Sequence, residues 1–288
     1  MKFCGRVALF FTAMLFALAQ PTAAMQEAPL PRSSHVPGGV ARIVVAPVTG
    51  ERKAPPQAWL GDQRVLVIEE GGQWLAIVGL ALDTAPGPQE LRVHHLGDTR
   101  RLPFTVDTKQ YPEQRITLKD TGKVQPSDTD LARIALEIAE IKKLKTHWRD
   151  TDDTDTRFAL PAKGRLSGRF GVRRFFNGEA RSPHAGFDIA APHGSAVTAT
   201  ARGVVLNVGD YFFNGKTVFV DHGNGLISMY CHLDRIDVAV GDTVNKSQRL
   251  GLVGMTGRAT GPHLHWSVIL NSAMVDPALF VPASAMAR

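Results

Sequence analysis

The chain has 288 residues, of which 44% are hydrophobic and 21% are charged. These values are typical of a globular protein and exclude a disordered chain, and the length suits two domains. The net charge is +6, but the basic residues are scattered and no motif of a nucleic-acid-binding module is present, so the charge does not indicate a nucleic-acid partner.

The first 24 residues have the layout of a secretory signal peptide. Lys2 and Arg6 give a positive start, residues 7–18 are apolar, and residues 22–24 are small. The apolar run is shorter than the roughly 20 residues that span a bilayer, which disfavours a membrane anchor. We therefore expect cleavage near Ala24, export, and no stable membrane span in the mature chain.

Short strand-like runs follow the leader and a polar lead-in. Residues 41–46, 64–68 and 73–79 are rich in β-branched and apolar side chains, and Gly71-Gly72 between the last two runs is a hairpin signal. Turn residues separate weaker runs further along. The pattern predicts a small β-sandwich over residues 38–110.

A single helix is predicted over residues 127–148. Ser127 followed by Asp130 resembles a capping box, with Asp in place of the usual Glu. One apolar stripe repeats at intervals of three and four residues: Leu131, Ile134, Ile138, Ile141, Leu144 and Trp148. We expect this helix to pack its stripe against one or both domains, because it is short for a coiled coil. Residues 149–156 are polar and rich in Asp, which is typical of a linker.

Residues 160–285 are glycine-punctuated and strand-like. Six of the ten histidines fall in this region, at positions 184, 193, 222, 232, 263 and 265. The lone cysteine of the mature chain, Cys231, lies in a strand-like run and is predicted to be buried and structural rather than a nucleophile. We interpret His193 and His222 as turn residues.

The pattern His263-Leu264-His265 begins an apolar strand. Residues two apart on a strand share a face, so both imidazoles point the same way while Leu264 packs inward. If residues 184–188 are extended, His184 and Asp188 also share a face, and Gly186 leaves room between them for a metal.

Catalytic zinc sites usually have three protein ligands and one open position. His184, Asp188 and one histidine of the 263/265 pair complete that set, and the spacing alone leaves open which one. His232 supplies a further imidazole. It and the remaining histidine of the pair could take a proton from water or stabilise an oxyanion.

Together these patterns resemble the M23 metallopeptidases of the lysostaphin and LytM type. The resemblance rests on His184-x-x-x-Asp188, Tyr230-x-His232-Leu233 and His263-x-His265, and on the framework runs at residues 168–171, 221–225 and 256–262. It covers about residues 160–285. The region over 38–110 with its following helix is similar to the N-terminal part of periplasmic members.

The resemblance implies a mainly β protein: an N-terminal β-sandwich, a linking α-helix and a C-terminal LytM-like antiparallel β-sheet metallopeptidase domain with an open groove. It implies one Zn²⁺ per chain, held by His184, Asp188 and His265, with His232 and His263 as the catalytic pair. The implied activity is hydrolysis of peptide cross-links, with the peptide stems of bacterial peptidoglycan as the partner.

Four residues are candidates to line the substrate groove: Arg169, Phe175, Asn177 and Tyr211. The absence of an obvious wall-binding repeat favours the periplasm over the extracellular space. Three alternatives stay open: a catalytically silent regulator of cell-wall amidases, an enzyme held inactive by its N-terminal region or by residues 165–183, and a peptidase for ordinary proteins or glycine-rich bridges. Protein partners of the N-terminal region are not indicated.

Overall fold

The computed structural model describes residues 1, 29–49, 55–116, 126–176 and 178–286. The predicted signal peptide, residues 1–24, therefore lies outside the described residues except for Met1. The N-terminal strands are β1 (Val40–Pro47), β2 (Gln57–Leu60), β3 (Gln63–Glu70), β4 (Gln73–Gly79), β5 (Gly87–His95) and β6 (Asp98–Val106).

The middle of the chain contains the one long helix and several short strands. These are β7 (Glu113–Ile116), α1 (Asp128–Lys145), β8 (Arg165–Gly168), β9 (Arg173–Phe176), β10 (Glu179–Ala180) and β11 (Phe187–Ala190). The remaining elements are β12 (Ala196–Thr198), β13 (Gly203–Tyr211), β14 (Gly215–Gly223), β15 (Leu226–Ile236), β16 (Thr243–Val244), β17 (Arg249–Val253), β18 (His263–Leu270), β19 (Ala273–Val275), η1 (Pro277–Phe280) and α2 (Ala283–Met286).

The N-terminal strands form two layers that share one apolar core. Strand β3 pairs with β2 as far as Val65 and with β4 from Leu66 onward, so it passes from one layer to the other. All six strands contribute side chains to this core, with Trp74 as its largest member. Gly71 and Gly72 have φ of 59° and 74°, the left-handed conformation that a two-residue hairpin between β3 and β4 requires.

The C-terminal strands form a ten-stranded antiparallel sheet. Its main order is β16-β13-β14-β15-β18-β11-β8, with β12 and β17 paired to each other, β17 also paired to β15, and β19 paired to β18. A smaller sheet of order β10-β9-β7 lies outside it, and its β7–β9 pair is parallel. The mainly β architecture predicted from the sequence is confirmed.

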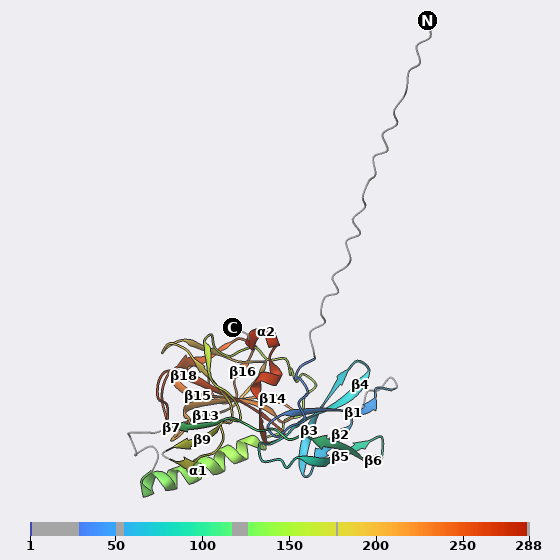
Figure 1. The fold of residues 1–288 in the computed structure, drawn as a ribbon, viewed down its shortest axis with the longest axis horizontal. Helices are drawn as coiled ribbons and strands as arrows, with labels where there is room; N and C mark the ends of the chain where they lie inside the picture. Colours follow the sequence, from blue (N-terminus) through green and yellow to red (C-terminus); the bar gives the residue numbers. More distant parts are fainter. Residues whose placement is uncertain (2–28, 50–54, 117–125, 177, 287–288) are drawn as a thin grey trace.

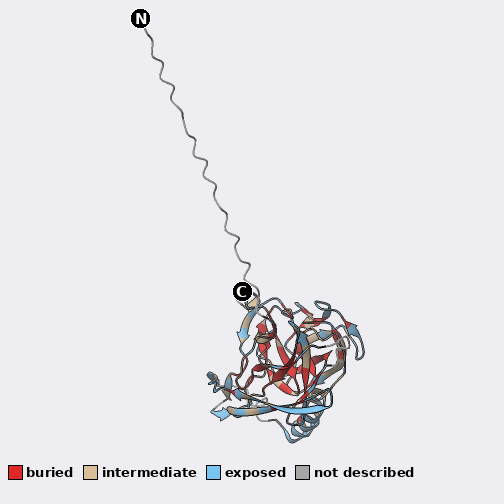
Figure 2. Cartoon of the chain, turned by 90° about the vertical axis from the view of Figure 1, so that its right-hand side faces the viewer, coloured by how far each residue is buried: buried red, intermediate tan, exposed pale blue. Residues whose placement is uncertain are grey.

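One apolar core is continuous between the N-terminal and C-terminal strands. Val40, Leu66 and Ile77 belong to the same buried cluster as Trp266 of β18. Figure 2 shows this concentration of buried residues inside the molecule, with exposed segments around it. Asn271, after β18, also bonds both backbone groups of Gly79, accepting from its nitrogen at 2.6 Å and donating to its oxygen at 3.0 Å. The two groups of strands are therefore packed as one unit.

Helix α1 runs along one side of the C-terminal sheet (Figure 1). Its predicted cap is present, because the Ser127 hydroxyl accepts a hydrogen bond from the Asp130 nitrogen at 3.2 Å. The predicted stripe is only partly right. Ile134 is buried, whereas Leu131 and Ile138 are 50% and 58% exposed, since the sheet contacts a narrower face of the helix. No helix among the described residues is long and apolar enough to cross a membrane.

Candidate metal centre

Three neighbouring strands of the C-terminal sheet carry most of the site. His265 on β18 lies directly opposite Asp188 on β11 and opposite Cys231 on β15. Residues directly opposite each other on antiparallel strands point to the same face, so the sheet itself brings Asp188 to His265. Leu264 is fully buried on the other face, as the alternation predicts.

His184 reaches the site from the loop before β11. The predicted extended run holds only in part, because β11 begins at Phe187 and His184 precedes it. Its backbone is held instead by the segment before β9: the nitrogen donates to the Val172 oxygen at 2.9 Å and the oxygen accepts from the Gly171 nitrogen at 2.8 Å. Gly186 leaves room as predicted, since a Cβ there would lie 2.8 Å from His265 Nε2.

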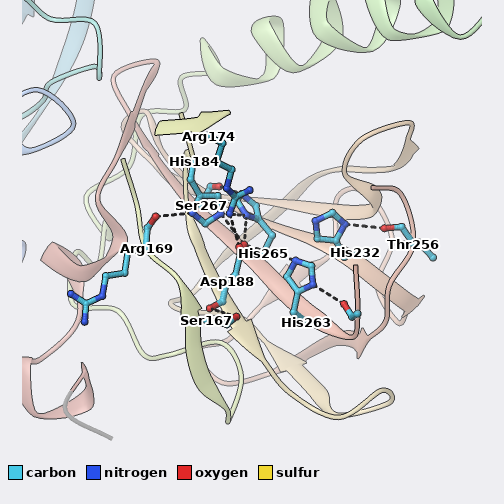
Figure 3. A network of polar contacts seen from close by, with 11 residues as sticks. Ser167, Arg169, Arg174, His184, Asp188, His232, Thr256, His263, His265 and Ser267 are labelled. Carbon is cyan, nitrogen blue, oxygen red and sulfur yellow. Dashed lines mark hydrogen bonds and ion pairs between the residues drawn. The ribbon is translucent and has the colours of Figure 1, made fainter. Parts of the chain in front are cut away.

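The three predicted ligand side chains converge on one point (Figure 3). His184 Nε2 lies 2.8 Å from Asp188 Oδ1 and 3.0 Å from His265 Nδ1, and His265 Nδ1 lies 2.8 Å from Asp188 Oδ1. Two imidazoles and one carboxylate are a donor set that suits zinc. Tetrahedral bonds of about 2.1 Å place ligand atoms about 3.4 Å apart, so the three atoms would have to separate by about half an ångström to hold the ion.

Hydrogen bonds on the outer ring atoms orient both histidines of this set. His184 Nδ1 lies 2.8 Å from the Arg169 carbonyl oxygen, which can only accept, so the proton of the neutral ring sits on Nδ1 and Nε2 faces Asp188 with its lone pair. His265 Nε2 lies 2.9 Å from the Ser267 hydroxyl, which leaves Nδ1 for the shared point. Such outer contacts are the usual means of fixing metal-binding histidines.

Asp188 is mostly buried and remains an anion. Burial alone would raise the pKa of this carboxyl group, but its close contacts with the His184 and His265 rings outweigh burial and hold the pKa well below its ordinary value. The second carboxylate oxygen accepts from Arg174 at 3.0 Å. Arg174 therefore contacts Asp188 from β9 without blocking the oxygen that faces the histidines.

His232 is placed by an irregularity in β15. Strand β15 pairs with β18 up to Cys231 and with β17 from Leu233, so His232 lies where its neighbours change. Its φ is 62°, a left-handed conformation that is rare for a residue with a side chain, and the ladder with β14 shifts register at this point. Bulges of this kind re-aim a side chain beside functional sites.

His232 and His263 form a second pair beside the first set. Their ring centres are 4.7 Å apart, and His263 Nε2 lies 3.9 Å from Asp188 Oδ1. The Nδ1 atom of each ring lies 2.8 Å from a carbonyl oxygen, of Thr256 for His232 and of Gly261 for His263. Since carbonyl oxygens only accept, each neutral ring keeps its Nε2 as a proton acceptor. Burial, followed by the charges of His265 and His263, lowers the pKa of His232 to about 3.

The predicted groove residues do not all lie at this site. The Arg169 side chain points away from the histidines in Figure 3, and only its backbone oxygen contributes. Phe175 alternates with Arg174 on β9 and packs under the Arg115 guanidinium at 4.3 Å, on the opposite face of the strand. Tyr211 is corrected: it is 4% exposed and belongs to an apolar cluster beneath α1, so it lines no groove. Asn177 lies outside the described residues.

The other histidines and Cys231 have structural settings. Cys231 is fully buried, as predicted, and burial raises the pKa of its thiol to about 12. His193 is an exposed turn residue. His222 is more deeply placed than a turn residue: it is 2% exposed, with Nδ1 2.8 Å from the Arg202 oxygen and Nε2 2.7 Å from the Ser228 hydroxyl.

Sequence reasoning missed Arg174, Ser267 and the carbonyl oxygens that orient His232 and His263. Arg174 lies on a short outer strand whose position depends on pairing with β7, which no local pattern reveals. The framework run 256–262 was noticed, but its contribution through the oxygens of Thr256 and Gly261 is a backbone effect that side-chain spacing does not show.

Known families and proteins match the chain in both halves. The model of Peptidase family M23 matches residues 182–277, and that of the Peptidase family M23 N-terminal domain matches residues 33–109. The chain is 39% identical over 121 residues to the peptidoglycan DD-endopeptidase ShyA of Vibrio cholerae. This match covers 42% of the present chain and 28% of ShyA.

A second curated relative is the DD-carboxypeptidase/endopeptidase Mpg of Neisseria meningitidis. The identity is 39% over 113 residues, covering 39% of this chain and 26% of that protein, so both matches span less than a third of the relatives' length.

A solved structure from Pseudomonas aeruginosa, whose name assigns it to peptidase M23, matches almost throughout. It is 42% identical with a TM-score of 0.73, and the match covers 88% of this chain and 97% of that one. On the strength of this match and of the two family models, the chain belongs to peptidase family M23.

Proposed function

We propose that this protein is an exported zinc endopeptidase that hydrolyses peptide cross-links of peptidoglycan. The observation that carries the proposal is the convergence of His184, Asp188 and His265, whose ligand atoms all lie within 4.8 Å of one another. These three side chains are 3% to 14% exposed, so the site is shielded yet can be reached from solvent.

His184 Nε2, Asp188 Oδ1 and His265 Nδ1 would hold one zinc ion. Bound there, zinc would supply Lewis-acid chemistry, lowering the pKa of a water molecule and polarising a peptide carbonyl group. The carboxylate and the two neutral rings balance one of the two positive charges of the ion. Arg174 keeps Asp188 in place through its second oxygen.

His232 and His263 supply the proton transfers. Both rings present Nε2 as an acceptor, because Nδ1 of each is fixed by a carbonyl oxygen. His263, whose Nε2 is 3.9 Å from Asp188 Oδ1, is the nearer of the two to the ligand set and is assigned to take the proton of the attacking water. His263 would then pass this proton to the departing amine, and His232, when its Nε2 carries a proton taken from solvent, would donate a hydrogen bond to the developing oxyanion. No covalent intermediate with the protein is required.

The substrate class comes from the relatives. ShyA and Mpg are named as DD-endopeptidase and as DD-carboxypeptidase/endopeptidase, and the M23 match covers all five site residues of this chain. Export, which the signal-like leader predicts, would bring the protein to peptidoglycan, with the periplasm as the proposed compartment.

The test is a pair of measurements on the mature chain. Metal analysis after purification should find one zinc per chain in the wild-type protein and none in His184→Ala. Digestion of cross-linked peptidoglycan should release uncross-linked stems only with the zinc-loaded wild type. Zinc binding without any release of stems, together with binding to a cell-wall amidase, would instead support the silent-regulator alternative.

The whole mature chain is the right material for this test. A fragment that starts near residue 155 would expose the buried face that Val40, Leu66 and Ile77 cover, because these residues share the core of the C-terminal sheet. Its loss of activity would therefore say nothing about inhibition by the N-terminal region.

A further inference from the structure

Two arginines lie side by side on the β9–β10 hairpin. The Arg181 nitrogen donates to the Arg174 oxygen at 2.9 Å, and the register that pairs Phe175 with Ala180 continues to this pair. Residues directly opposite each other share a face, and like charges in that arrangement repel. Since Arg174 reaches Asp188, the shared face is the one turned toward the proposed metal ligands.

A third arginine comes from the loop between β17 and β18. The Arg258 guanidinium stacks over the Phe213 ring at 4.3 Å, and its backbone nitrogen donates to the Phe213 oxygen at 2.9 Å. The same loop contains Thr256 and Gly261, whose oxygens orient the catalytic histidines. Arg258 is thus fixed to a segment that already forms one side of the site.

The three guanidinium groups are close enough to affect one another. Burial lowers the pKa of Arg258, and the charges of Arg181 and Arg174 lower it further. We call Arg174, Arg181 and Arg258 the arginine cluster. It combines residues from two separate segments, and its member Arg174 contacts Asp188. A bound divalent cation would add to the positive potential of the cluster.

The cluster is largely removed from solvent. The side chains of Arg174 and Arg181 are 27% and 28% exposed, and Arg174 Nε is a buried donor without a hydrogen-bond partner among the described residues. Arg181 does contact Glu179, but that carboxylate is 59% exposed and lies at the outer end of the hairpin. Partly buried like charges repel one another, so an additional anion placed among them would be stabilised.

We propose that the arginine cluster binds a free carboxylate of the substrate peptide, on the residue next to the bond that is cleaved. This inference rests on the proposed function. The planar fork of a guanidinium fits a carboxylate with two parallel hydrogen bonds. An extended peptide advances about 3.5 Å per residue, so a carboxylate held beside Asp188 belongs to a residue adjoining the reacting carbonyl group. The enzyme would therefore discriminate against substrates whose carboxylate is amidated.

The experiment compares two synthetic cross-linked stem peptides that differ only at that carboxylate, one free and one converted to the carboxamide. We expect the zinc-loaded wild type to favour the free acid by about tenfold or more in kcat/KM, chiefly through KM, as a charge-assisted hydrogen bond allows. In Arg181→Gln and Arg258→Gln the ratio should fall toward one. Because each ratio is measured on one preparation, loss of folded protein cancels.

Arg173→Gln is the matched control. Arg173 neighbours Arg174 on β9 but points the other way, where it pairs with Glu113 at 3.2 Å, and it is 58% exposed. The same charge is removed, yet the ratio should stay at the wild-type value. Calorimetry with metal-free protein supplies a readout independent of turnover: the free acid should bind more tightly than the carboxamide.

A wild-type ratio near one, or an unchanged ratio in both Gln variants, would overturn the inference while leaving the proposed function intact. If the wild type cleaves neither peptide, the proposed function fails, and the calorimetric preference still decides whether the cluster binds the carboxylate.

Discussion

His222 offers a quantitative test of the buried structure behind the site. Its ring is 2% exposed, packs against Phe158 with 5.0 Å between ring centres, and bonds to Arg202 and Ser228. Burial lowers its pKa from 6.5 to about 4, against smaller opposing effects of the Arg202 hydrogen bond and nearby carboxylates. The folded protein therefore resists protonation that the unfolded chain accepts.

The sign follows from proton binding. Between pH 6.5 and 4 the unfolded state binds more protons at this residue, so the free energy of unfolding rises with pH there and is lost as the pH falls. One pKa unit corresponds to about 1.4 kcal/mol, so the free energy of unfolding should fall by about 2–3 kcal/mol between pH 7.5 and pH 4.5 through this residue.

The assay is denaturant unfolding of the wild type and His222→Gln at both pH values. Both proteins are kept metal-free with a chelator, so that loss of zinc at low pH plays no part. The wild type should be the more stable at pH 7.5, and its advantage should shrink by about 2–3 kcal/mol at pH 4.5, because only the wild type carries the titrating ring. The other histidines titrate in both proteins and cancel. An advantage that is the same at both pH values would refute the reasoning.

Three further predictions follow from the site and the core. His232→Ala and His263→Ala should each keep the zinc content of the wild type but lower kcat by about 10²- to 10⁴-fold, and full turnover by either variant would contradict its assigned role. Gly186→Ala should reduce zinc affinity, measured by competition with a chelator. The added Cβ would lie 2.5 Å from a backbone oxygen of β18 and would push the segment before β11 away from β18. Unchanged affinity would show that this segment and β18 accommodate the methyl group without moving the ligands. Asn271→Ala should lower the free energy of unfolding by about 2–4 kcal/mol in a single transition, since it loses both bonds to Gly79. Two separate transitions would show that the N-terminal and C-terminal strands unfold independently.

The parts of the site that depend on local alternation could be predicted from the sequence. The shared face of His263 and His265 follows from strand geometry alone, and the buried Leu264 between them agrees. The register between β11 and β18 decides whether His263 or His265 lies opposite Asp188. This pairing is non-local and cannot be read from the spacing of the residues. The resemblance to a family supplied that assignment.

Long-range packing accounts for the predictions that failed or were incomplete. Tyr211 is a candidate groove residue from the sequence, but its hydroxyl donates to Asn207 and its ring packs against Phe219 beneath the helix. Leu131 and Ile138 obey the helical repeat, yet the sheet is too narrow to cover them. The change of partner at His232 arises from three strands meeting, which no single run of residues encodes.

The first and last described segments of the chain hold each other. The Arg32 nitrogen donates to the Leu279 oxygen, Phe158 donates to the Phe280 oxygen, and Val40 and Val281 belong to one buried cluster. During synthesis, which proceeds from the N-terminus, this part of the cluster cannot close until residues 279–281 have left the ribosome. Strand β1 can pair with β4 before then, but Val40 completes its buried surroundings only when Phe280 and Val281 join the same cluster.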